Sequence, residues 1–189
     1  YEEWIHHADT VKDLMSYRLN QEYFNEYIHI NRKKIAFYSG LHDLGKLDIE
    51  WQKKTNIKNS TLAHFPFTKG SRGEVRTHSS IGAYILKDFI DDDIIFNLIL
   101  QHHKRIPIDE GVINKTSSWE LHKDTYNILN EYGFKELIKT KGVQTLINNK
   151  DIITPSHKDW TTLLYLVGTF MEVEIQAIKE CINNNKYIK

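Results

Sequence analysis

A histidine and an aspartate stand side by side at positions 42 and 43, followed closely by a glycine and by Lys46. An imidazole nitrogen and a carboxylate oxygen on adjacent residues can bind one divalent cation, and the second carboxylate oxygen can reach another. His-Asp pairs also arise by chance in many soluble domains. His42 and Asp43 therefore predict a metal centre only if other segments supply further ligands.

Amphipathic helices are predicted before and around this pair. In residues 4–18 the apolar positions recur at helical spacing, and His7 lies on their stripe. A second helix is predicted over 31–45, where Gly45 suits a helix C-terminus. This helix carries His42 on its apolar face, with the aspartate turned beside it.

Two further helices carry more histidines. The first is predicted over 78–89, and its first residue, His78, belongs to the inner face. Aspartates supply negative charge at the start of the second, residues 94–103. That helix is apolar on nearly every side, which is typical of a buried helix, and it ends in the pair His102-His103.

The last helix is predicted over 160–181. Glu174 falls inside its apolar face, whereas Glu172 points the opposite way. The remaining segments are predicted as an amphipathic helix at 22–30, a short helix at 47–54, loops at 55–77 and 104–118, and two or three helices within 120–149. No strand pattern or repeat competes with these helices. The predicted fold is all-α, in a single domain over residues 1–189.

Seven candidate ligands therefore come from five predicted helices, each on an apolar face or at the end of an apolar segment: His7, His42, Asp43, His78, His102, His103 and Glu174. Burying these groups without partners is unfavourable, and divalent ions would satisfy them together. Imidazole and carboxylate ligands without thiolates favour manganese, iron, nickel, cobalt or zinc, and match magnesium less well. Seven ligands exceed the needs of one ion, so we expect two ions bridged by Asp43, the usual arrangement for phosphate ester hydrolysis.

Lysines and arginines near these ligands are candidates for contact with a substrate. Lys46 is the candidate catalytic residue beside Asp43, because an ammonium there can contact a phosphate and stabilise developing charge. A solvated lysine beyond a helix end fits its position equally well. The candidates for nucleic acid binding are Lys53, Lys54, Arg72, Arg76, Lys104 and Arg105. Taken one at a time, each of these is more simply interpreted as a solvated charge.

Composition restricts the possible partners. Lysine plus arginine and aspartate plus glutamate are equal, at 25 each, so any nucleic acid contact must be local. The single cysteine, Cys181, excludes an internal disulfide and a thiolate zinc site. Apolar runs are far shorter than the roughly 18 residues of a membrane span and no leader is evident, so we expect no membrane contact and a cytoplasmic protein. Because the chain begins at Tyr1 rather than methionine, we also expect it to come from something longer.

Four signatures span nearly the whole chain: His7 four residues before Val11, the block His42 to Lys46 continuing to Trp51-Gln52, His78-Ser79 with Gly82-Ala83, and the pair His102-His103. With them the chain resembles the HD superfamily of metal-dependent phosphohydrolases. Within it, the chain looks most like the HD nuclease domain of the CRISPR-associated type I interference helicase-nuclease. The histidine-serine helix start and the paired histidines are more specific than the His-Asp block, which marks only the superfamily.

The resemblance implies an HD-domain helical bundle with a buried metal site. It implies a nuclease that cleaves single-stranded DNA with transition-metal ions in antiviral defence, with a helicase domain or subunit and a guide-RNA surveillance complex as partners. The resemblance implies that one metal is held by His7, His42, Asp43 and the last-helix carboxylate. The other metal is held by Asp43, His78, His102 and His103, and Lys46 assists at the scissile phosphate. The family usually has an aspartate in the last helix, where this chain offers Glu174.

Two other functions stay open. Members of the superfamily also hydrolyse nucleotides, which requires an enclosed pocket rather than an open groove. A glutamate in place of the usual aspartate is compatible with a one-metal or weakened enzyme, or with a metal-binding module that has no activity.

Overall fold

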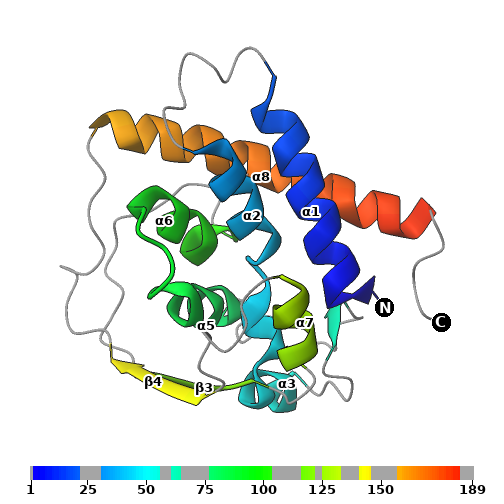
Figure 1. The fold of residues 1–189 in the computed structure, drawn as a ribbon, viewed down its shortest axis with the longest axis vertical. Coiled ribbons are helices and arrows are strands. Elements are labelled where there is room, and N and C mark those ends of the chain that lie inside the picture. Colours follow the sequence, from blue (N-terminus) through cyan, green and yellow to red (C-terminus); the bar gives the residue numbers. More distant parts are fainter. Residues whose placement is uncertain are drawn as a thin grey trace.

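The computed structural model describes residues 2–21, 31–55, 61–64, 77–103, 116–121, 125–132, 141–145 and 157–183. Helices dominate these residues, which confirms the all-α prediction (Figure 1). The elements in chain order are β1 (Glu2–Glu3), α1 (Trp4–Leu19), α2 (Arg32–Gly40), the 3₁₀ helix η2 (Leu44–Leu47), α3 (Ile49–Lys54), β2 (Leu62–His64), α5 (Thr77–Leu86), α6 (Asp93–Gln101), β3 (Thr116–Glu120), α7 (Thr125–Glu131), β4 (Lys141–Thr145) and α8 (His157–Asn183).

The hydrophobic core lies between α1, α2, α6 and α8. α1 packs against both α2 and α8, and α6 packs against α2, α5 and α8. Side chains from all four helices are fully buried there, among them Val11, Ile35, Ile99 and Phe170. Burial stabilises this packing by about 25 cal/mol for each Å² of apolar surface removed from water. The core thereby fixes the helix ends from which the candidate ligands extend.

α6 is a buried helix with a defined start. The Asp92 carboxylate accepts hydrogen bonds from the backbone N–H groups of Ile94 (2.9 Å) and Ile95 (3.2 Å), so it caps the helix in addition to supplying the negative charge that the sequence predicts there. Residues 94–101 are all buried, which confirms the prediction of a core helix. The two histidines that follow α6 therefore begin inside the protein.

The helix predicted over 31–45 is shorter than expected. α2 ends at Gly40, and a turn leads from it into η2. Gly45 does not end a helix: a Cβ at this position would lie 2.0 Å from the backbone oxygen of His78. Glycine is needed there because η2 and α5 pack backbone against backbone. The His-Asp pair consequently lies in a turn rather than on a helix.

Two short antiparallel strand pairs correct the prediction that the chain has no strands. β1 pairs with β2, which lies within the loop predicted over 55–77. β3 pairs with β4, in segments where the sequence predicts a loop and a helix. Two or three helices are predicted within 120–149, and among the described residues of this range α7 is the helix. Strands of two to five residues are too short to show a clear two-residue alternation.

Asp48 joins α3 to β3. Its side chain accepts hydrogen bonds from the backbone N–H groups of Trp51 (2.7 Å) and Glu120 (2.8 Å), and its residue is 1% exposed. The first bond caps α3, the short helix predicted over 47–54. The second holds the β3–β4 pair against the end of η2.

The other predicted boundaries differ by a few residues. α5 begins at Thr77 and ends at Leu86, and α8 begins at His157 rather than near Trp160. The helix predicted over 22–30 lies outside the described residues. Within the described ranges, none of the helices combines the length and the apolar character needed to cross a lipid bilayer.

Candidate metal centre

Histidines and one aspartate from four segments meet at a buried place. His7 comes from α1, His42 and Asp43 from the turn after α2, His78 from the first turn of α5, and His102 and His103 from the end of α6. The first five of these residues are at most 1% exposed, and His103 is half-buried. The structure therefore brings six of the seven candidate ligands to a common interior point.

Asp43 belongs to two groups of side chains whose nitrogen and oxygen atoms lie within 4.8 Å of one another. The first group is His7, His42 and Asp43, and the second group is Asp43, His78, His102 and His103. Oδ2 of Asp43 lies 3.3 Å from Nε2 of His42 and 3.6 Å from Nε2 of His7. Oδ1 lies 3.0 Å from Nε2 of His78 and 3.8 Å from Nε2 of His102. Each carboxylate oxygen thus faces its own pair of imidazoles.

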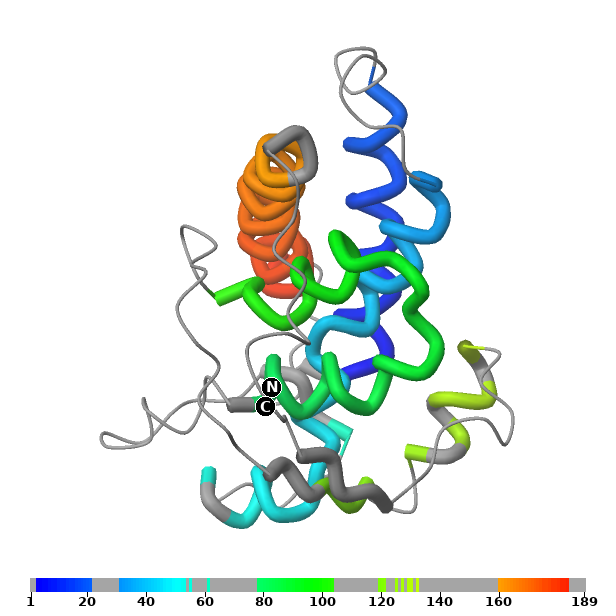
Figure 2. Tube along the Cα trace, turned by 90° about the vertical axis from the view of Figure 1, so that its left-hand side faces the viewer, coloured from blue at the N-terminus to red at the C-terminus, as the bar shows by residue number. Residues whose placement is uncertain are grey.

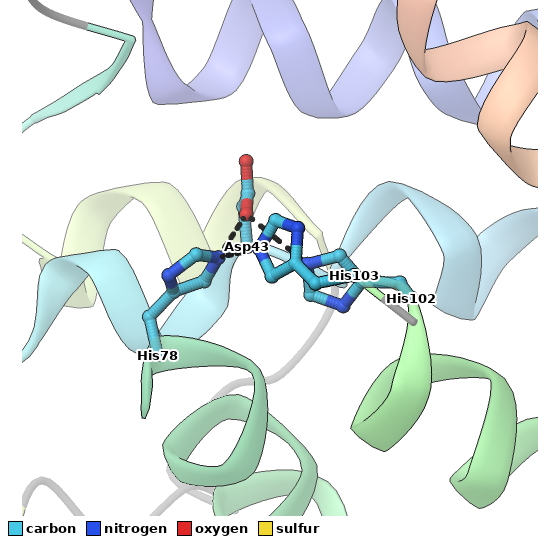
Figure 3. A group of neighbouring side chains, drawn as sticks. All are labelled: Asp43, His78, His102 and His103. Atoms are coloured by element: carbon cyan, nitrogen blue, oxygen red, sulfur yellow. Dashed lines mark hydrogen bonds and ion pairs between the residues drawn. The ribbon is translucent and has the colours of Figure 1, made fainter. Parts of the chain in front are cut away.

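Figure 3 shows how the second group is assembled. His78 approaches Asp43 from the start of α5, while His102 and His103 approach from the end of α6. The Nε2 atoms of His78 and His103 are 2.9 Å apart. The packing of α5 against α6 and of α5 against η2 holds these three segments together.

Backbone carbonyl groups orient two of the histidines. Nδ1 of His42 lies 2.8 Å from the carbonyl oxygen of Ser39, and Nδ1 of His102 lies 2.6 Å from that of Ile99. A carbonyl oxygen only accepts hydrogen bonds, so Nδ1 donates in each ring. In the neutral ring, Nε2 then carries the lone pair on the side of Asp43, where it is available to a metal ion.

Three buried atoms of the centre have no hydrogen-bond partner in the described part of the chain: Nε2 of His42, Nε2 of His102 and Oδ1 of Asp43. His78 lies close to this oxygen, but without the geometry of a hydrogen bond. More than about 90% of buried polar groups in proteins are satisfied, so three orphans at one point indicate an absent partner. Imidazole nitrogen and carboxylate oxygen suit a divalent transition-metal ion, and the residues present therefore fit one.

The electrostatics keep Asp43 and the paired histidines His102 and His103 in the protonation states that a cation requires. Burial raises the pKa of Asp43, but His42 and Lys46 outweigh burial and hold this pKa well below its usual value. Burial and the neighbouring His103 hold the pKa of His102 well below its usual value. Burial and His78 lower the pKa of His103 to about 3. At neutral pH the carboxylate is ionised, and the paired histidines are neutral.

His42 differs from the paired histidines. Burial lowers its pKa, but the adjacent carboxylate of Asp43 outweighs burial, and the pKa of His42 is raised above its usual value. The same negative charge that favours a proton on His42 would favour a cation in its place.

Lys46 is buried rather than solvated. It is 3% exposed, and its Nζ lies 2.6 Å from Oδ2 of Asp43. Gln52 donates a hydrogen bond from Nε2 to the backbone oxygen of Lys46 at 2.9 Å. The alternative of a solvated lysine beyond a helix end is therefore wrong, because η2 turns this side chain inward.

Glu174 of α8 approaches the first group without joining it. Its Oε1 lies 4.0 Å from Nε2 of His42, and its side chain is 17% exposed. Glu172 is exposed on the other side of α8. Among the described acidic side chains of α8, Glu174 is thus the one that approaches His42, but it lies farther out than the other six candidate ligands.

Of the six basic residues predicted to bind nucleic acid, Lys53 alone has a described side chain. It is exposed, and its Nζ lies 2.6 Å from Oε1 of Glu50. Lys54 ends α3, and its side chain is outside the description, as are the whole residues Arg72, Arg76, Lys104 and Arg105.

Two residues that lie beside the centre, Phe170 and Gln52, are not predicted from the sequence to be site residues. The ring of Phe170 on α8 meets the rings of His42 and His102 edge-on, with centroids 4.8 Å and 5.9 Å away. Its position four residues before Glu174 is the signal that could have placed it there. Gln52, which holds the backbone of Lys46, belongs to the signature that continues to Trp51-Gln52, but the sequence assigns it no role in the site.

Comparison with known proteins identifies the family. A family model of the HD domain matches residues 14–142, well over half of the chain, and this range contains both the His42-Asp43 pair and the three ligands that follow it. No curated protein and no solved structure matches the chain. The buried histidine and aspartate groups are typical of the metal site of HD domains. The chain therefore belongs to the HD domain family of metal-dependent phosphohydrolases.

Proposed function

We propose that this HD domain hydrolyses phosphate esters of nucleotides or nucleic acids with two divalent ions, one on each side of Asp43. One observation carries the proposal: Oδ2 of Asp43 faces His7 and His42, while Oδ1 faces His78 and His102. A carboxylate with separate imidazoles around each oxygen suits a ligand shared by two ions.

The ligand sets follow from the two groups. His7, His42 and Asp43 would hold the first ion together with Glu174, and Asp43, His78, His102 and His103 would hold the second. When bound, such ions polarise a phosphoryl oxygen and lower the pKa of a bound water. The nitrogen-rich ligand set favours manganese, iron, cobalt or nickel, with magnesium a poorer match.

The chain's own residues contribute charge and orientation. Lys46 places an ammonium 2.6 Å from Oδ2 of Asp43 in a buried setting, where it can stabilise the negative charge that develops on a phosphoryl group. The carbonyl oxygens of Ser39 and Ile99 hold His42 and His102 in the required tautomer. These contacts position the ligands before any substrate arrives.

Burial of the centre supports a nucleotide substrate. Asp43 and Lys46 are 0% and 3% exposed, and His103 is the half-buried member of the two groups. A small phosphate ester that enters on the side of His103 would meet both groups and the ammonium. Sites for small molecules bury most of their ligand, and the burial of these side chains is the observation that favours such a substrate.

The signatures in the sequence support a second substrate, single-stranded DNA. The His78-Ser79 helix start and the His102-His103 pair resemble those of the CRISPR-associated HD nuclease, which implies phosphodiester cleavage in antiviral defence. Under this alternative a helicase domain or subunit and a guide-RNA surveillance complex would deliver the strand. The basic residues at 53, 54, 72, 76, 104 and 105 would then lie along its path.

The two substrates are separated by one set of assays. Purified protein is loaded with manganese and incubated in parallel with end-labelled single-stranded DNA and with nucleoside mono-, di- and triphosphates. Release of phosphate without strand cleavage supports the nucleotide substrate, and shortened DNA supports the nuclease. Asp43→Ala should remove either activity, whereas Asp88→Ala, an exposed aspartate elsewhere, should retain it.

A third outcome has its own signature. If Glu174 does not complete the first ligand set, the protein binds a single ion and has weak or no activity. Metal analysis that finds no bound ion, together with unchanged thermal stability on adding manganese, would contradict the metal-dependent function altogether.

A further inference from the structure

α8 carries a second stripe of residues on the face turned away from the metal centre. Gly168, Glu172, Ile175, Lys179 and Ile182 follow one another at spacings of three and four residues, which places them on one side of the helix. Ile175 and Ile182 are each 53% exposed. These residues lie beyond the range matched to the HD domain. Figure 2 shows α8 at the edge of the described fold, with α1 on one side.

A shallow hollow lies at one end of this stripe. It measures about 380 Å³ and is lined by Thr161, Leu164, Tyr165, Gly168, Thr169 and Glu172. A Cβ added to Gly168 would meet nothing within 4 Å, so the space over the glycine is open. Leu164 and Tyr165, which are 46% and 51% exposed, give the hollow apolar walls. The hollow is therefore open to solvent, and most of its lining is apolar.

We propose that this face binds the same face of a second copy of the chain, with the two α8 helices antiparallel. A two-fold axis that crosses α8 between Ile175 and Gln176 relates residues at equal distances on either side. Glu172 lies three positions before Ile175, and Lys179 lies three positions after Gln176. Each copy's Glu172 then faces the other copy's Lys179, so the pair forms twice. Within the described residues, neither side chain has a partner in its own chain.

The same two-fold axis also places a side chain of the second copy in the hollow. Ile182 lies six positions after Gln176, and Thr169 lies six positions before Ile175. Ile182 of the second copy therefore reaches the hollow beside Gly168, where the missing side chain lets the helices approach closely. A parallel pair would instead set Glu172 against Glu172, which is unfavourable. Charge and shape thus select the same antiparallel arrangement.

A charge-swap cycle on the full chain tests the proposal by sedimentation velocity and light scattering. The wild type should dimerise in a concentration-dependent manner. Glu172→Lys and Lys179→Glu each place two like-charged pairs across the interface and should weaken the dimer by about tenfold. The double variant, Glu172→Lys with Lys179→Glu, restores both pairs and should restore the wild-type Kd. Asp88→Lys makes the same charge change elsewhere on the surface and should have no effect.

A second variant tests the hollow independently of charge. Gly168→Leu places a side chain in the hollow, where the second copy's Ile182 would lie, and should also weaken the dimer, with circular dichroism showing that the helices are retained. A wild type that stays monomeric at about 100 µM overturns the proposal. A dimer that responds to neither single swap, or a double variant as weak as the singles, overturns it as well.

Discussion

Replacing Gly45 with alanine should push η2 away from α5 and thereby open the metal centre. An alanine Cβ at this position would lie 2.0 Å from the backbone oxygen of His78 and 2.8 Å from the backbone nitrogen of Gly82. Real Cβ atoms essentially never approach another heavy atom closer than 3.0 Å. Both obstructing atoms belong to the backbone of α5, so no side chain can rotate to make room.

The size of the effect follows from this geometry. Bringing the closest contact to 3.0 Å requires η2 to move by about 1 Å, and overpacking of this kind typically costs about 1–3 kcal/mol. We expect the upper end, about 3 kcal/mol, which lowers Tm by about 6–12 °C in a chain of this length. Asp43 lies two residues before Gly45 and contacts His78 at 3.0 Å, so the same movement should weaken metal binding by about 10–100-fold.

Chemical denaturation and manganese titration of Gly45→Ala measure both effects. Gly168→Ala is the matched control, because its Cβ would meet nothing within 4 Å and alanine is the better helix former by about 1 kcal/mol. At a protein concentration at which the chain is monomeric, this control should be as stable as the wild type or more so. A Gly45→Ala protein that unfolds within about 0.5 kcal/mol of the wild type would refute the packing of η2 against α5.

Three further predictions concern the free energy of unfolding of the chain. Lys46→Met leaves the Asp43 carboxylate buried without the lysine ammonium, so denaturant titration should show that the free energy of unfolding falls by about 3–5 kcal/mol, and added manganese should reduce this loss. An unchanged unfolding midpoint would contradict the contribution of the ion pair. The free energy of unfolding of the metal-free protein should fall as pH falls from about 6.5 to about 3, because the pKa values of His102 and His103 are lowered in the folded state, and the unfolded chain takes up protons that the folded chain does not. The raised pKa of His42 acts in the opposite sense, because its contribution to stability is lost as pH rises. A free energy of unfolding that increases on acidification would contradict this prediction. Asp48→Ala removes the cap of α3 and the bond to β3, so it should cost about 2 kcal/mol in the same assay while the number of bound ions stays at the wild-type value.

Helical periodicity is sufficient to predict the buried faces of α1, α6 and α8. His7 lies on the apolar stripe of α1, and the uninterrupted apolar run before His102 predicts a helix surrounded by protein. Both residues are buried because a side chain in register with core residues has no route to water. The same reasoning separates Glu174 from Glu172 on α8.

Contacts between segments could not be predicted in this way. The local sequence predicts Gly45 as the end of a helix, but its role is set by contact with the backbone of α5, more than 30 residues later in the chain. The strand pairs depend on partners distant in sequence, and strands of two to five residues have too little pattern to reveal them. Lys46 turns inward because η2 is a 3₁₀ helix, which no local signal distinguishes from the end of an α-helix. The distance of Glu174 from His42 likewise depends on how α8 lies across the core.

Metal stoichiometry tests the central claim most directly. The purified chain is saturated with manganese, freed of excess ion and analysed by elemental mass spectrometry beside Asp43→Ala and His102→Ala, with circular dichroism as the control for folding. The shared carboxylate predicts two ions in the wild type, none in Asp43→Ala and one in His102→Ala. A folded Asp43→Ala protein that still holds two ions would contradict the claim that Asp43 is a ligand shared by both.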